Sequence, residues 1–168
     1  MHDTSPETLR ISSTTFAQGQ TLPSSVVFDG MGCKGGNRSP HLAWSDVPEG
    51  TQSFAVICHD PDAPTGVGFF HWILANIPVG VRELAEGAGN AGAASMPSGA
   101  VSGVSDFGAV GYGGPCPPPG DAPHHYRFTV YALKSKLPVD ATLGGAKLRF
   151  MTRGNLLATG TIVGLYGR

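Results

Sequence analysis

The stretch from His59 to Trp72, with the sequence HDPDAPTGVGFFHW, constrains the fold of this chain more than any other. The apolar run before it, residues 53–58, is typical of a buried strand, and a second apolar run begins at His71. Proline has no N–H to donate to a strand ladder, so the two prolines between these runs predict a sharp strand–loop–strand corner. Asp60 and His71 are therefore expected at the same end of one sheet.

A second corner has the same character. The segment GYGGPCPPPG, residues 111–120, leads into the apolar run HHYRFTVYAL, residues 124–133. The two-residue period of a strand places His124 and Tyr126 on one face and Arg127 on the other. Polar residues at the ends of two apolar strands predict two halves of one pocket.

Composition predicts a turn-rich, mainly β protein. Charged residues make up 14% of the chain, below the roughly 25% of an average domain. Glycine and proline punctuate the apolar runs, which favours an antiparallel two-sheet β-sandwich with Greek-key connections and one or two short helices. Strands are expected near residues 8–17, 22–28, 40–44, 53–60, 71–78, 126–133 and 156–166, a helix near 145–153, and a long surface excursion over 80–110.

Length and charge limit the classes of protein further. The 168 residues fit one domain, of which residues 1–8 are expected to form a flexible tail. With 11 basic and 12 acidic residues, nothing steers the chain towards nucleic acid or an anionic membrane. An N-terminus without an apolar signal core predicts a cytoplasmic protein, and no apolar run is long enough for stable membrane insertion.

The cysteines are predicted to be three reduced thiols. Cys33, Cys58 and Cys116 are odd in number and widely spaced, with no CxxC pair. That pattern argues against a disulfide framework and against a zinc knuckle.

The residue types at the two corners favour anion binding. Imidazoles, a phenol and the loop amides around residues 113–114 can donate to phosphate oxygens, while Asp60 can accept from an amine. Two alternatives stay open. One is a hydrolase with His71 or His124 as general base, although neither corner holds a serine nucleophile. The other is a divalent-metal site of Asp60, Asp62, His71 and His124.

The chain resembles the phosphatidylethanolamine-binding protein family, in its bacterial Raf-kinase-inhibitor-like branch. The segments that carry the resemblance are SPHLAW (39–44), DPDAP (60–64), HWILANIP (71–78), DFG (106–108), GYGGPCPP (111–118), HHYRFTVYAL (124–133) and VGLYGR (163–168). The resemblance implies a two-sheet sandwich with a small pocket for phosphate-bearing or carboxylate ligands. Carried over by position, the pocket-lining residues are Asp60, His71, Gly114, Pro115, His124 and Tyr126, with Asp62 and Trp72 close by.

The resemblance also implies a function. It implies a non-enzymatic protein that binds a small anion or a phospholipid head group, without catalytic residues, metal or cofactor. An inhibitory or regulatory action on a partner enzyme of the protease or kinase class, a homodimer and a cis Ala63–Pro64 bond are further expectations from it. His125 stands where the family usually has arginine, which replaces a fixed charge with a titratable one.

Overall fold

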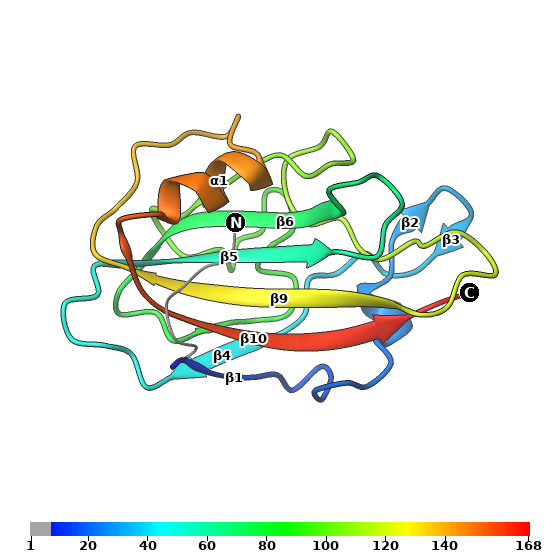
Figure 1. Cartoon of the computed structure of the whole chain (residues 1–168), viewed down its shortest axis with the longest axis horizontal. Helices are drawn as coiled ribbons and strands as arrows, with labels where there is room; N and C mark the ends of the chain where they lie inside the picture. Colours follow the sequence, from blue (N-terminus) through cyan, green and yellow to red (C-terminus); the bar gives the residue numbers. More distant parts are fainter. Residues whose placement is uncertain (1–7) are drawn as a thin grey trace.

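The computed structural model describes residues 8–168 as a β-sandwich with one short helix (Figure 1). Of the expected tail, residues 1–7 lie outside the described part, while the Thr8 N–H donates to the carbonyl oxygen of Thr159. The mainly β, antiparallel fold expected from the sequence is confirmed, because every pairing between the named strands is antiparallel.

The strands form two facing sheets and a small hairpin. The larger sheet has the order β10 (Leu156–Tyr166), β9 (His124–Leu133), β5 (Ser53–Asp60), β6 (Phe69–Pro78) and β8 (Val101–Ser102). The smaller sheet has the order β1 (Arg10–Ser12), β4 (Leu42–Ser45) and β7 (Glu83–Leu84), and the hairpin pairs β2 (Asp29–Gly30) with β3 (Cys33–Lys34).

Two expected elements differ in detail. The helix expected near 145–153 is present as α1, Gly145–Thr152. The strand expected over 22–28 is not present; this segment holds a 3-10 turn, η1, at Ser24–Val26. The 80–110 excursion contributes the two short strands β7 and β8 to the two sheets.

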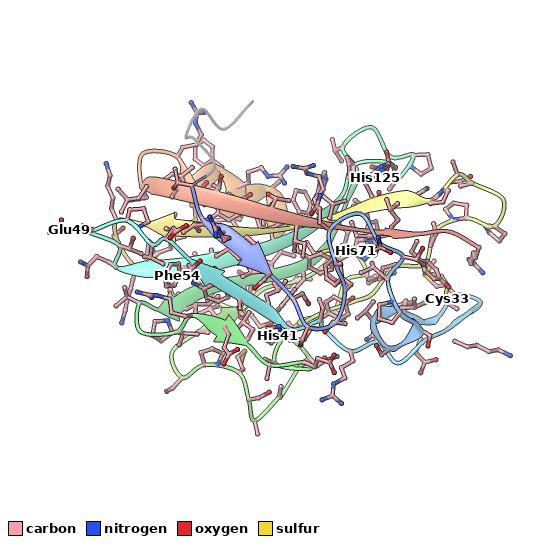
Figure 2. The ribbon with its side chains drawn as sticks, turned by 90° about the horizontal axis from the view of Figure 1, so that it is seen from below. Cys33, His41, Glu49, Phe54, His71 and His125 are labelled. Carbon is pink, nitrogen blue, oxygen red and sulfur yellow. A yellow bond between two sulfur atoms is a disulfide. The ribbon has the colours of Figure 1, made fainter. Side chains whose placement is uncertain are left out.

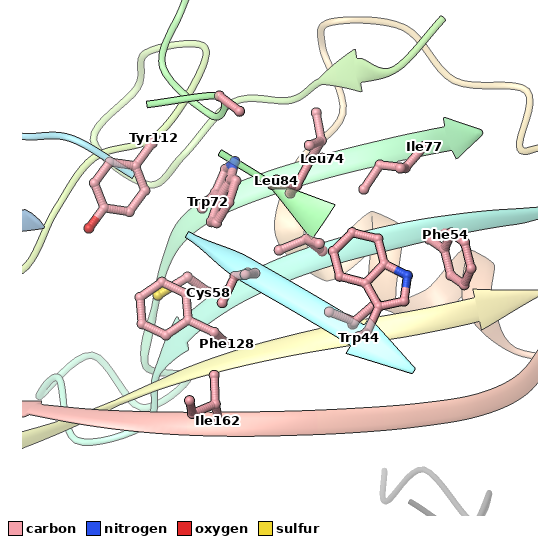
Figure 3. Packing of buried hydrophobic residues seen from close by; sticks show 14 of the residues in the cluster. Trp44, Phe54, Cys58, Trp72, Leu74, Ile77, Leu84, Tyr112, Phe128 and Ile162 are labelled. Carbon is pink, nitrogen blue, oxygen red and sulfur yellow. The ribbon is translucent and has the colours of Figure 1, made fainter. Parts of the chain in front are cut away.

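Apolar layers cover both faces of the central strands. One core lies between the sheets and includes Trp44, Phe54, Trp72 and Phe128 (Figure 3). The other lies between the larger sheet and α1 and is built around Leu148. Strands buried on both faces read as continuous apolar runs, which is why the runs that became β5 and β6 do not alternate.

Two sequence predictions about covalent geometry are wrong. Cys33 and Cys116 form a disulfide, so only Cys58 is free, and it is buried. Wide spacing in sequence was a poor guide, because the fold brings the two Cα atoms to 6.0 Å across a separation of 83 residues. The Ala63–Pro64 bond is trans, as are all peptide bonds within residues 8–168.

The disulfide ties the β2–β3 hairpin to the loop that leads into β9. Disulfides persist mainly in oxidising compartments. The pair therefore does not support the cytoplasmic expectation, which stays a prediction.

Thiol titration of the denatured protein should find one free thiol, Cys58, before reduction and three after it. The Cys33→Ser/Cys116→Ser double variant should lose about 2–4 kcal/mol of unfolding free energy, because the cross-link restricts the unfolded chain. Chemical denaturation of both proteins measures that difference. Three free thiols in protein purified without reductant would contradict the pairing.

Candidate functional site

The candidate site lies at one end of the larger sheet. Strands β9, β5 and β6 are neighbours there, and β5 ends at Asp60 where β9 begins at His124. His71, His125 and Cys33 lie towards this end of the molecule, and Glu49 lies at the opposite end (Figure 2). The two corners inferred from sequence therefore meet, as the strand–loop–strand pattern predicts.

A β-bulge turns His71 towards the site. Cys58 pairs with Trp72 and His59 pairs with Phe70, which leaves His71 as the extra residue on β6. Strict alternation would place His71 on the α1 face of the sheet, but its ring contacts that of Tyr126 on the other face, with centroids 5.3 Å apart. Bulges beside functional sites commonly re-aim a side chain in this way.

His124 is held between two carboxylates. Its Nδ1 lies 2.7 Å from Asp60 Oδ2, and its Nε2 lies 2.9 Å from Asp121 Oδ2. Carboxylates accept hydrogen bonds, so the ring donates from both nitrogens and is an imidazolium. Burial opposes this charge, but the hydrogen bonds from His124 to Asp60 and Asp121 outweigh burial and raise the pKa of His124.

Asp62 organises the corner next to this pair. Its backbone N–H donates to Asp60 Oδ1 at 2.8 Å, and its own carboxylate accepts from the backbone N–H and ring of His125. Partial burial works against the charged Asp62, but the hydrogen bonds from His125 prevail and lower its pKa. Asp62 thus holds the position of Asp60 and the start of β9.

His71 differs from His124 in its charge. Its Nδ1 lies 2.8 Å from the carbonyl oxygen of Gly113, which can only accept, so Nδ1 carries the proton. The side chain is buried against Phe69 and Phe107. Burial lowers the pKa of His71 to about 4, and the hydrogen bond to Gly113 only partly opposes this. At neutral pH His71 is uncharged, and Nε2 offers a lone pair.

Tyr126 supplies a donor without a partner. Its side chain is fully buried, and its hydroxyl makes no hydrogen bond within the described part of the chain. The ring stacks near that of His124, with centroids 6.4 Å apart. Burial, followed by the charge of Asp60, raises the pKa of Tyr126 well above its ordinary value, so the phenol keeps its proton.

Gly114 and Pro115 follow Gly113, whose carbonyl oxygen accepts from His71, and they lie against residues 26–28. The Gly114 N–H donates to Asn37 Oδ1 at 2.8 Å, and the Gly113 N–H donates to the carbonyl oxygen of His71. Both amides are thus engaged within the protein, whereas the sequence suggested that they donate to a ligand. A Cβ on Gly114 would clash with the carbonyl of Val26, so the close approach of two backbones requires glycine there.

Trp72 follows His71 on β6 and lies in the core next to the site. The indole is fully buried in the core between the sheets and packs against Tyr112 and Phe128. Gly89 lies so close to the indole ring that a Cβ at residue 89 would clash with it.

Three contributing residues were missed in the sequence. Asp121 contacts His124, Asn37 holds the 113–114 loop, and Phe107 packs edge-on against His71. Asp121 had a usable signal, because it precedes His124 by only three residues. Asn37 and Phe107 lie far from their partners in sequence, so only the fold shows their contacts.

Neither a metal site nor a membrane span is found among the described residues. No cluster of three or more His, Cys, Asp or Glu within 8–168 is arranged to hold a metal ion. The helix in this part of the chain is too short and polar to cross a membrane.

The fold agrees with the comparisons with known proteins. The model of the phosphatidylethanolamine-binding protein family matches residues 12–167. The chain is 51% identical to YbcL of Escherichia coli K12, covering 94% of this chain and 86% of the relative, and 44% identical to YbhB of the same organism, covering 94% and 99%. The chain therefore belongs to the phosphatidylethanolamine-binding protein family.

Solved structures support this assignment. The crystal structure of Escherichia coli YbcL superposes with a TM-score of 0.93 at 49% identity, covering 96% of this chain and 99% of that one. A homologue from Chlamydia trachomatis gives a TM-score of 0.80 at 33% identity, covering 97% and 99%. These relatives fit the bacterial branch of the family, which the sequence motifs indicate.

The pKa values of His71 and His124 should be shifted in opposite directions from the ordinary imidazole value. NMR of the imidazole signals should show His71 neutral down to about pH 4, and His124 charged to above its ordinary 6.5. Because the pKa of His71 is lower in the folded protein than in the unfolded chain, its contribution to the unfolding free energy is complete above pH 6.5. This contribution, about 3 kcal/mol, is lost as pH falls towards about 4. The contribution of His124 is complete below 6.5 and lost as pH rises through its raised pKa.

Unfolding of His71→Gln between about pH 6.5 and pH 4 provides the control. This variant should lose less stability over that interval than the wild type. A His71 signal that titrates near the ordinary imidazole value would contradict the buried, neutral assignment.

Proposed function

We propose that the protein binds a small phosphate- or carboxylate-bearing ligand, such as a phospholipid head group, at the His124–Tyr126 end of the larger sheet. The observation that carries the proposal is the buried hydroxyl of Tyr126, which has no hydrogen-bond partner within residues 8–168, beside the imidazolium of His124. A buried polar group without a hydrogen bond is costly, so a ligand oxygen that accepts from it gains free energy.

Each site residue has a role in this proposal. His124 and Tyr126 donate to the anion, and His71 accepts through Nε2 from a protonated ligand oxygen. Asp60 keeps His124 charged, and Asp62 holds Asp60 in place. Gly114, Pro115 and Trp72 supply shape and support.

The geometry favours binding over hydrolysis. A general base needs a free lone pair and a pKa near the working pH. Both nitrogens of His124 are engaged with carboxylates, and a pKa of about 4 makes His71 a weak base. A steady release of nitrophenol from para-nitrophenyl phosphate that disappears in His71→Ala would reverse this preference.

Some expectations from the resemblance remain predictions. They are an inhibitory or regulatory contact with a protease- or kinase-class enzyme, a homodimer and a cytoplasmic location.

Calorimetry with inorganic phosphate should show binding that His124→Ala weakens by about 1.5–3 kcal/mol, the usual range for a charge-assisted hydrogen bond. The control is His41→Ala, because His41 contacts Glu83 and Thr14 at the smaller sheet, away from the site. Equal affinity in all three proteins would remove His124 from the site.

The pH dependence is best measured with sulfate, whose charge is constant where that of phosphate changes. His124 is charged below its raised pKa, so sulfate affinity should be high at about pH 5.5 and should fall as pH rises towards about 8.5. The same affinity at both values would show that the imidazolium does not hold the anion.

A further inference from the structure

Asp121 occupies the ring nitrogen of His124 that does not face Asp60. The carboxylate lies 2.9 Å from His124 Nε2, at the start of β9. The Asp121 side chain is 42% exposed, whereas those of His124 and Asp60 are 4% and 3% exposed. One carboxylate in this cluster is therefore open to solvent, and the other is built into the fold.

We propose that Asp121 is an internal competitor for the anion site: its carboxylate takes the donor on His124 that a ligand anion needs, and binding requires its displacement. The inference rests on the proposed function and adds to it a residue that sets the affinity of the site for anions. The Asp121 carboxylate accepts from the His124 donor that a ligand anion would need.

The side chain of Asp121 can leave without a change of the loop. Its backbone N–H donates to the carbonyl oxygen of Pro118, and the Gly120 N–H donates to that of Arg168. Gly120 adopts a φ of +88°, a value that favours glycine and fixes the turn before Asp121. The backbone is thus anchored while the exposed carboxylate can rotate into water. Because the Asp121 carboxylate is partly exposed, water can replace its hydrogen bond to His124.

When a ligand carboxylate displaces the carboxylate of Asp121 from His124, the net gain in binding free energy is small. A ligand carboxylate restores the same charge on His124 that Asp121 already supplies. A phosphate has more charge and three terminal oxygens, so it can accept from His124 and Tyr126 together. Asp121 thereby lowers the affinity of both ligand classes, and phosphate-bearing ligands, which accept from more donors, still bind.

The charges around His124 are consistent with this competition. Asp60 and Asp62 on the β5–β6 corner and Asp121 on the loop before β9 face His124 and its neighbour His125. His71 adds no charge, since its pKa lies at about 4. Removal of the exposed carboxylate leaves the buried Asp60 to keep the imidazolium charged.

The test compares Asp121→Asn with the wild type by calorimetry at about pH 6, where the ring of His124 is charged. Inorganic phosphate should bind about three- to fivefold more tightly to the variant, and acetate should gain by a similar factor. The matched control is Asp29→Asn, which removes the same charge from an exposed residue of the β2–β3 hairpin. Its affinities should stay within about twofold of the wild type, because long-range effects of exposed charges are screened.

The outcomes separate this inference from the proposed function. Phosphate binding to the wild type with equal or weaker binding to Asp121→Asn would overturn the competitor role and leave the site in place. An equal gain in Asp29→Asn would also overturn it, because the effect would then be one of net charge. Absence of phosphate binding in every protein would remove the proposed function and the inference with it.

Discussion

The buried pair of Asp60 and His124 is the interaction on which the site depends. The two side chains are 3% and 4% exposed and meet at 2.7 Å. Burial of an ion pair costs desolvation energy that only good geometry and additional hydrogen bonds offset. The Asp62 N–H supplies one such bond to Asp60, and Asp121 supplies the second acceptor for His124. The two corners therefore hold the imidazolium of His124 in its charged form at a buried position.

Two histidines at the same end of one sheet have opposite properties because their surroundings differ. Carboxylates flank His124, whereas His71 faces a carbonyl oxygen and aromatic rings. The result is one charged donor and one neutral ring with a free lone pair, beside the protonated phenol of Tyr126. This combination suits a partly protonated oxyanion, which can both accept and donate.

Sequence reasoning reached the strands and the meeting of the corners because those depend on local signals. Apolar runs ended by proline and glycine located β5, β6 and β9, and the two-residue period placed His124 and Tyr126 on one buried face. It did not reach the bulge that turns His71, because a bulge depends on the register between strands. The Cys33–Cys116 pair was missed because it depends on packing between segments far apart in the chain. The strand expected over 22–28 was wrong because local hydrogen bonds from Val26 to Pro23 and from Val27 to Ser24 close a 3-10 turn there.

A structure of the protein with inorganic phosphate at about pH 6 tests the central claim most directly. The account predicts a phosphate oxygen within hydrogen-bond distance of both His124 Nε2 and the Tyr126 hydroxyl, with the Asp121 carboxylate turned into solvent and the Asp60–His124 contact intact. A phosphate bound elsewhere, with Asp121 still on His124 and the Tyr126 hydroxyl unpartnered, would contradict it.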